Sequence, residues 1–99
     1  MSMTVRDVLR VHKASTLRLQ VAFGISLVGL TVSVVDSNRP ELENPLITVL
    51  DEEEGTLRFD WTDEQIATLK LGIDNRFRLQ LDYPDGSSFK SNRIWVRVT

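Results

Sequence analysis

The chain has 99 residues, of which 41% are hydrophobic and 26% are charged, and its formal net charge is −2. A chain of this length forms one domain with one modest core, and its apolar content is too high for an intrinsically disordered protein. It contains no cysteine, which excludes disulfides, thiolate metal sites and thiol catalysis and agrees with assembly in a reducing cytoplasm.

The charges are distributed unevenly along the chain. Residues 1–30 contain four basic residues and one acidic residue, residues 31–64 contain two basic and ten acidic residues, and residues 65–99 contain six basic and three acidic residues. Solvated loops and strand faces account for this distribution. The functional alternative is the docking of an acidic patch on a basic neighbour, which would set the register and the rate of association more than the affinity.

Residues 1–13 are expected to form an N-terminal segment that precedes a β-sandwich domain of residues 14–99. Within residues 4–12 the apolar side chains recur at both helical and strand spacing. Several β-branched residues favour extended structure. The segment is therefore predicted to be an edge strand of the same domain or an arm that reaches a neighbouring subunit.

The first two strands of the domain are predicted at residues 15–23 and 30–36. The uncharged stretch of residues 19–35 has the composition of a signal peptide or a membrane span. However, it contains two glycines and alternates between apolar and polar positions, as two strands around a turn do. We therefore expect neither secretion through a signal peptide nor insertion in a membrane.

Residues 37–45 are predicted to form the longest loop, and long loops in compact domains are where binding residues concentrate. A short apolar strand is expected at residues 46–50. The four acidic residues 51–54 then precede Gly55 and are predicted to form an exposed hairpin tip. Calcium binding is not expected there, because the loop lacks the alternating oxygen ligands and the distal bidentate glutamate of an EF-hand.

Residues 56–61 form the clearest strand of the chain, because apolar and polar residues alternate strictly along it. The predicted inward side chains are Leu57, Phe59 and Trp61. Directly after this strand, Thr62 and Gln65 have the spacing of a capping box. This spacing predicts one short helical turn near residues 62–70.

Further strands are predicted at residues 76–83 and 89–98, with a Tyr-Pro-Asp-Gly hairpin turn between them. About seven short strands with hairpin turns and one helical turn indicate an all-β fold. The spacing of the strands predicts an antiparallel immunoglobulin-like β-sandwich. The prediction concerns the architecture only, because the disulfide of antibody domains is absent.

The sequence contains no recognisable catalytic constellation. His12 is the only histidine, and one histidine without cysteine does not furnish an ordinary zinc site. Neither a nucleophile elbow nor a phosphate-binding loop is present. Carboxylates for a glycosidase pair are plentiful, but a sandwich of this size has little room for a deep substrate cleft. We therefore expect a protein that is not an enzyme and that has no cofactor and no metal site.

Arginine and tryptophan share the outward positions of the last two predicted strands. Basic residues interleaved with an aromatic residue are typical of single-strand nucleic-acid binding. Nucleic acid is nevertheless not the expected partner, because the whole chain is slightly acidic and a protein interface is equally rich in these residue types. The candidate interface residues are Arg39, Glu41, Glu43, Arg93, Trp95 and Arg97.

The segment of residues 50–98 resembles a recurring module of phage tail proteins. In that module a Gly-Thr strand and a Thr-x-x-(Gln/Glu) unit precede a helical turn, an aromatic-led strand, a Pro-Asp-Gly hairpin and a terminal strand. The matching pieces here are Gly55 to Trp61, Thr62 to Gln65, Phe77 to Tyr83, Pro84 to Gly86 and Ile94 to Val98. In these segments the chain resembles the immunoglobulin-like domain of phage baseplate upper proteins and related small phage tail and virion structural proteins.

The resemblance implies a non-enzymatic virion protein of the tail, baseplate or an adaptor or decoration layer. Its expected partners are other virion proteins and further copies of itself on a symmetric particle that is assembled in the host cytoplasm. Such proteins usually lead into further domains, whereas this sequence ends at Thr99, which favours an adaptor or decoration role. The alternative is a carbohydrate-binding β-sandwich module that uses Trp61, Tyr83 or Trp95 as a stacking surface.

Overall fold

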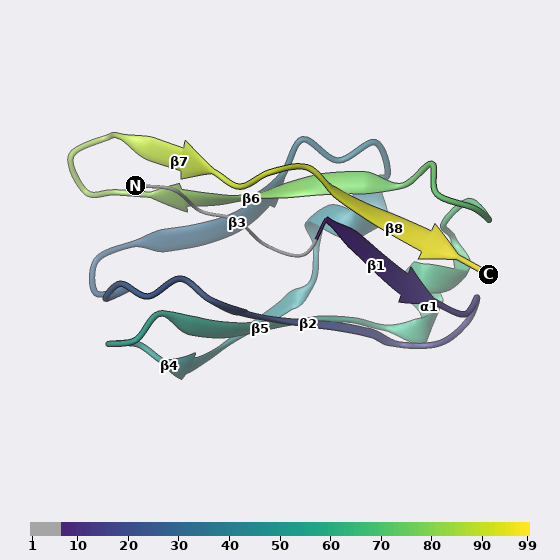
Figure 1. Ribbon diagram of the computed structural model, residues 1–99, viewed down its shortest axis with the longest axis horizontal. Helices are drawn as coiled ribbons and strands as arrows, with labels where there is room; N and C mark the ends of the chain where they lie inside the picture. The colour runs from purple at the N-terminus through teal and green to yellow at the C-terminus, as the bar shows by residue number, and fades with distance from the viewer. Residues whose placement is uncertain (1–6) are drawn as a thin grey trace.

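The computed structural model describes residues 7–99, which form two β-sheets and two short helices (Figure 1). The strands are β1 (Val8–Val11), β2 (Leu17–Ala22), β3 (Thr31–Val35), β4 (Leu46–Asp51), β5 (Thr56–Trp61), β6 (Arg76–Asp82), β7 (Ser88–Lys90) and β8 (Ile94–Val98). The helices are the 3-10 helix η1 (Pro40–Glu43) and the α-helix α1 (Asp63–Ala67). The predicted all-β class is therefore confirmed; residues 1–6 of the predicted N-terminal segment lie outside the described residues.

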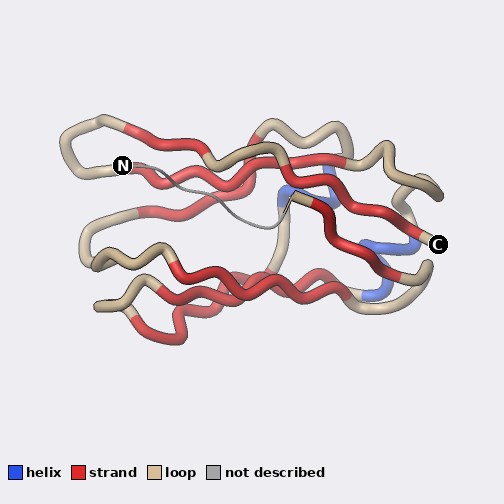
Figure 2. The backbone as a smooth tube through the Cα atoms, viewed as in Figure 1, coloured by secondary structure: helices blue, strands red, loops and turns tan. Residues whose placement is uncertain are grey.

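The two sheets lie in separate layers (Figures 1 and 2). The larger sheet has the strand order β1-β8-β6-β3, with β7 also paired to β6, and the smaller sheet has the order β2-β5-β4. Strand β1 runs parallel to β8, with Val8 opposite Trp95 and Val11 opposite Val98. The prediction of an entirely antiparallel arrangement is therefore wrong at β1, because side chains alternate in the same way in parallel and antiparallel strands and do not reveal direction.

The strand predicted at residues 89–98 is interrupted at residues 91–93, which separate β7 from β8. Ser91 is buried, and its hydroxyl accepts a hydrogen bond of 2.9 Å from the backbone N–H of Leu79. The N–H of Ser91 donates to the Leu79 carbonyl at 2.8 Å. The Ser91 hydroxyl oxygen thus accepts the hydrogen bond that a backbone carbonyl accepts in a regular sheet. The alternation of apolar and polar residues does not predict this change of acceptor.

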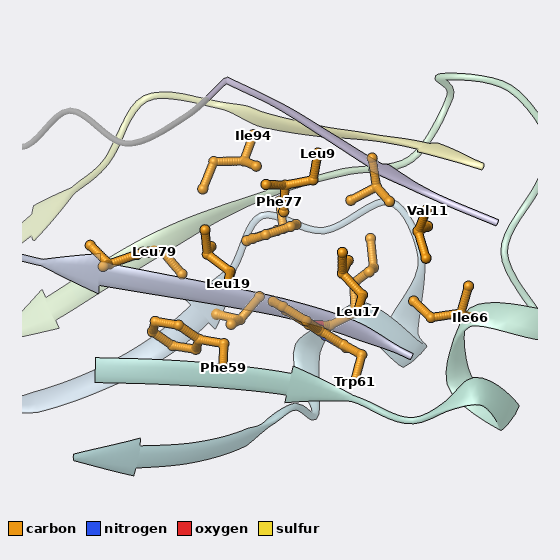
Figure 3. Packing of buried hydrophobic residues seen from close by; sticks show 14 of the residues in the cluster. Leu9, Val11, Leu17, Leu19, Phe59, Trp61, Ile66, Phe77, Leu79 and Ile94 are labelled. Carbon is orange, nitrogen blue, oxygen red and sulfur yellow. The ribbon is translucent and has the colours of Figure 1, made fainter. Parts of the chain in front are cut away.

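The core lies between the two sheets, and Figure 3 shows side chains from both layers meeting there. The predicted inward residues of β5 are at most 1% exposed. The ring of Trp61 packs against Phe59 and Phe77, with centroid distances of 6.3 and 5.4 Å. Alternation along the central strands therefore predicted correctly which side chains form the core.

Helix α1 closes one end of the core. Both bonds of the predicted capping box are present, since the Gln65 N–H donates to Thr62 Oγ1 at 3.2 Å and the Thr62 N–H donates to Gln65 Oε1 at 2.8 Å. Ile66 and Leu69 are buried, as their spacing predicts. No helix in the part of the chain that the structure describes has the length and apolar character of a membrane span.

Candidate protein interface on the larger sheet

The outward side chains of β1, β6 and β8 form a basic surface around one tryptophan. Alternation on these strands turns Leu9, Phe77 and Val96 into the core, so the residues between the core positions lie on the outer face. We use the name Trp95 face for its basic and aromatic residues, which are Arg10, Arg76, Arg78, Arg93, Trp95 and Arg97; Gln80 and Asp82 of β6 lie on the same side of the sheet. The structure therefore brings together three of the predicted interface residues and adds three arginines from β1 and β6.

The indole of Trp95 is half-buried between two arginines. The guanidinium carbons of Arg76 and Arg93 each lie 5.8 Å from the centroid of the ring. Arg76 is also the register partner of Trp95 on β6. Cation–π contacts of this kind hold both guanidinium groups beside the ring, which limits their freedom before any partner binds.

Arg10 and Arg97 lie directly opposite each other on β1 and β8, and both are exposed. Like charges at such positions destabilise a sheet. Within residues 7–99, Arg76 is the only arginine of the Trp95 face that has a carboxylate within 4.0 Å. The face therefore has an excess of positive charge that a partner with carboxylates would neutralise.

A carboxylate at the border of the Trp95 face reports on this positive charge. Asp36 accepts a hydrogen bond of 3.0 Å from the ammonium group of Lys90. This bond is the main cause of a lowered pKa of Asp36, and the charges of Lys90, Arg78 and Arg93 lower it further. Lys90 therefore favours the ionised form of Asp36 most, and Arg78 and Arg93 of the Trp95 face add to this effect.

Arg39, from the loop of residues 37–45, is linked to the Trp95 face through Asp74. The Asp74 carboxylate lies 3.6 Å from Nη2 of Arg39 and 3.9 Å from Nη1 of Arg76. Glu41 and Glu43, the other two predicted residues of this loop, form no ion pair with the Trp95 face in the described part of the chain. Instead, Glu43 accepts a hydrogen bond from the Ser37 N–H at 3.4 Å and the Glu41 carbonyl accepts one from Gln65.

Asn75 holds this region together and was not identified from the sequence. Its side chain is fully buried and donates to the carbonyls of Lys70 and Val96 at 2.7 and 3.2 Å. Its Oδ1 accepts from the Lys70 N–H at 3.1 Å and from Arg39 Nε at 3.3 Å. The adjacent Asp-Asn pair predicts a turn, but the partners of Asn75 on β8 and in the loop are distant in sequence and cannot be deduced from it.

The three aromatic residues of the carbohydrate-binding alternative have different environments. Trp61 is 1% exposed, and its Nε1 donates to the Leu42 carbonyl at 3.0 Å, so its role as a stacking surface is excluded by burial. Tyr83 is half-buried and packs edge-on against Phe89 at a centroid distance of 5.6 Å. Trp95 combines a partly open ring with two flanking arginines.

Asp60 lies in a hollow of about 660 Å³ on the outer face of the smaller sheet. Its two carboxylate oxygens accept hydrogen bonds from Arg18 Nε at 2.7 Å and Arg58 Nε at 2.9 Å. The bond from Arg18 is the main cause of the lowered pKa of Asp60, and the bond from Arg58 adds to it. Both oxygens are therefore engaged by fixed cations, which suits a structural carboxylate better than a general base.

A second hollow, of about 370 Å³, opens between the edge strands β3 and β4 and is lined mostly by apolar side chains. The adjoining strand β4 was predicted as an apolar strand, yet Leu46 is 68% and Val49 is 52% exposed.

In residues 7–99, no group of three or more histidine, aspartate or glutamate side chains is arranged to hold a metal ion.

Two comparisons with known proteins found no relative of the chain. No protein-family model matches the chain. The search of curated proteins found no match either.

Proposed function

We propose that the protein is a non-enzymatic structural component of a phage virion that acts by docking on neighbouring proteins in a symmetric assembly. Its place would be the tail, the baseplate or an adaptor or decoration layer. The observation that carries this proposal is the Trp95 face, where the partly open Trp95 lies between Arg76 and Arg93 and four of the five arginines have no ion-pair partner in residues 7–99. Tryptophan and arginine are enriched among the residues that dominate binding at protein interfaces.

The strand order supports an immunoglobulin-like β-sandwich as the fold of this module. In that fold the second, fifth and fourth strands form one sheet with the third, sixth and seventh strands on the other. Strands β2, β5 and β4 occupy the first set of positions, and β3, β6 and the β7–β8 pair occupy the second. Strand β1 pairs with β8 rather than with β2, so it extends the larger sheet at its edge.

Two further observations support a role in assembly. The phage-tail resemblance rests in part on a capping box and a hairpin turn, and the chain forms both: Thr62 and Gln65 make the capping box, and the Gly86 N–H donates to the Tyr83 carbonyl at 3.0 Å. The carboxylate in the hollow on the smaller sheet, Asp60, is already engaged by two arginines. Both favour a structural part over an enzyme.

The proposal is tested by mass spectrometry and immunogold labelling of gradient-purified particles from the organism or prophage that encodes the chain. We expect the protein in the particles at several copies, in a fixed ratio to the other virion proteins. The Arg97→Glu variant should be depleted from particles although it folds. The Gln20→Glu/Ala22→Glu variant lowers the net charge by the same two units on the smaller sheet and should be incorporated. Absence of the wild-type protein from purified particles would overturn the proposal.

The carbohydrate-binding alternative requires Trp95, since Trp61 is buried. The chain has two tryptophans, so the Trp61→Phe variant contains Trp95 as its only indole fluorophore. Quenching or a spectral shift of that fluorescence by a soluble glycan would favour the alternative. An unchanged spectrum across a panel of glycans would leave docking on protein as the better explanation.

A further inference from the structure

The longest run of acidic residues in the sequence lies at the turn between β4 and β5. We call residues 51–54 the acidic turn, and all four of its side chains are exposed. None of the four forms an ion pair within residues 7–99. Their charge is therefore as uncompensated inside one copy of the protein as the charge of the Trp95 face.

The backbone of the acidic turn is held in place by the segment of residues 23–27. The N–H groups of Leu27 and Gly24 donate to the carbonyls of Glu52 and Glu54 at 2.8 and 3.1 Å, and the Phe23 N–H donates to the Gly55 carbonyl at 2.9 Å. Within the turn, the Glu54 N–H donates to Asp51 Oδ1 at 3.1 Å. A turn that is ordered before binding loses little conformational entropy when a partner covers it.

The acidic turn and the Trp95 face lie on different layers of the molecule. Figure 1 shows the β4–β5 connection at one end of the smaller sheet, whereas β1 and β8 lie side by side at the edge of the larger sheet. The two surfaces therefore have opposite charge but belong to different sheets. A second copy of the chain can bring them together.

We infer that the Trp95 face binds the acidic turn of a second copy of this chain. The four carboxylates of the turn match the four arginines of the face that have no ion-pair partner in residues 7–99. Because each copy offers both surfaces, two copies can exchange the contact in a closed two-fold dimer, or the contact can run head-to-tail around a ring or along a filament. The inference rests on the proposed function and specifies one contact within the symmetric assembly.

The inference is tested by analytical ultracentrifugation of the wild-type protein and two charge-reversed variants. The first is Arg93→Glu/Arg97→Glu, and the second is Glu52→Lys/Glu53→Lys. At about 100 µM protein the wild type should associate at about 50 mM NaCl, and its apparent Kd should rise at least about tenfold at about 500 mM NaCl, because exposed charges are screened. Each variant alone should remain monomeric, because the first lowers the summed charge of the five arginine positions from +5 to +1 and the second raises the summed charge of the acidic turn from −4 to 0.

Mixing the two variants provides the decisive measurement, since the unchanged acidic turn of the first variant can then meet the unchanged Trp95 face of the second. We expect the equimolar mixture to associate, and the Gln20→Glu/Ala22→Glu control to associate as the wild type does. Circular dichroism would verify that every variant is folded.

A wild-type protein that stays monomeric at low salt, or a mixture that does not associate, would overturn the inference. So would salt-sensitive binding of a single-stranded oligonucleotide that is abolished by Arg93→Glu/Arg97→Glu while the wild type does not self-associate. The protein's presence in purified particles is measured independently, so failure of the self-contact is distinguishable from failure of the virion role.

Discussion

The indole Nε1 of Trp61 donates a hydrogen bond of 3.0 Å to the carbonyl oxygen of Leu42, and both residues are 1% exposed. The bond joins the end of β5 to helix η1. It fastens the loop of residues 37–45 to the core, while Gln65 Nε2 holds the same loop through the Asn44 carbonyl at 2.7 Å. The loop that carries Arg39 is therefore anchored both by the buried Trp61 and by Gln65 nearer the surface of the protein.

Trp61→Phe should lower the free energy of unfolding by about 1–3 kcal/mol, because it keeps an aromatic ring in the core but leaves the buried Leu42 carbonyl without its donor. Urea denaturation followed by circular dichroism measures this change. The matched control is Trp95→Phe on the partly open surface, which should change the stability by about 0.5 kcal/mol or less. Equal effects of the two substitutions would contradict the role of the buried hydrogen bond.

Gly55→Ala should destabilise the protein more than Gly24→Ala. Both glycines have a φ of +73°, so both alanines meet the same left-handed backbone strain of about 1–2 kcal/mol. Only at Gly55 would the added Cβ collide with the backbone oxygen of Ile25, whereas the space beside Gly24 is open. We expect a further loss of at least about 1 kcal/mol for Gly55→Ala in thermal or urea unfolding. Equal losses of stability for the two substitutions would show that the backbone oxygen of Ile25 does not restrict the side chain at position 55.

Leu9→Ala tests the contribution of the parallel strand β1. Leu9 is 4% exposed in the shared core, so its truncation should lower the free energy of unfolding by about 2–4 kcal/mol. On the same strand, Arg10→Ala removes an exposed side chain that faces Arg97 and should change the stability by about 0.5 kcal/mol or less. A small effect of Leu9→Ala would mean that β1 is dispensable for the core.

Asp60 should contribute stability that depends on pH. Its folded-state pKa is lowered, chiefly by the bond from Arg18 and then by that from Arg58, so the unfolded chain binds the proton more tightly. The contribution is therefore complete above the unfolded-state pKa of about 3.9 and is lost as the pH falls through the lower pKa of the folded state.

Asp60→Asn should lower the stability at pH 7 by about 1 kcal/mol or less, since the Arg18 side chain is 65% exposed and solvent screens the pair. The difference from the wild type should shrink towards pH 2, as measured by urea unfolding at a series of pH values. In the Arg18→Gln background the effect of Asp60→Asn should be smaller. A difference that is independent of pH would rule out the ion pairs as its source.

Short-range patterns were enough to predict most of the secondary structure. The alternation of Leu57, Phe59 and Trp61 and the three-residue spacing of Thr62 and Gln65 both involve residues that are close in sequence. The structure has the buried face and the capping box in the predicted places. The interruption at Ser91 was not predicted, because it depends on a hydrogen bond to Leu79 across the sheet.

The candidate interface was predicted only in part. Trp95 and Arg97 lie two residues apart on β8 and Arg93 directly precedes this strand, so the two-residue spacing alone predicts that the three share one face. Arg10 and Arg76 join them only because β1 and β6 flank β8, which is a matter of strand neighbours. Glu41 and Glu43 were chosen for their charge, and charge does not reveal which surface a loop residue shares.

Residue alternation, turn residues and composition thus determined that the chain is a β protein with one apolar interior, because these signals act within a few residues. The direction of β1, the burial of Asn75 and the gathering of arginines on the Trp95 face were decided by contacts between segments far apart in the chain. Asn75 has hydrogen-bond partners 21 and 36 residues away, and Arg10 meets Arg97 only through the pairing of the first strand with the last. Such contacts follow from how the whole core packs, and no local pattern of residues encodes them.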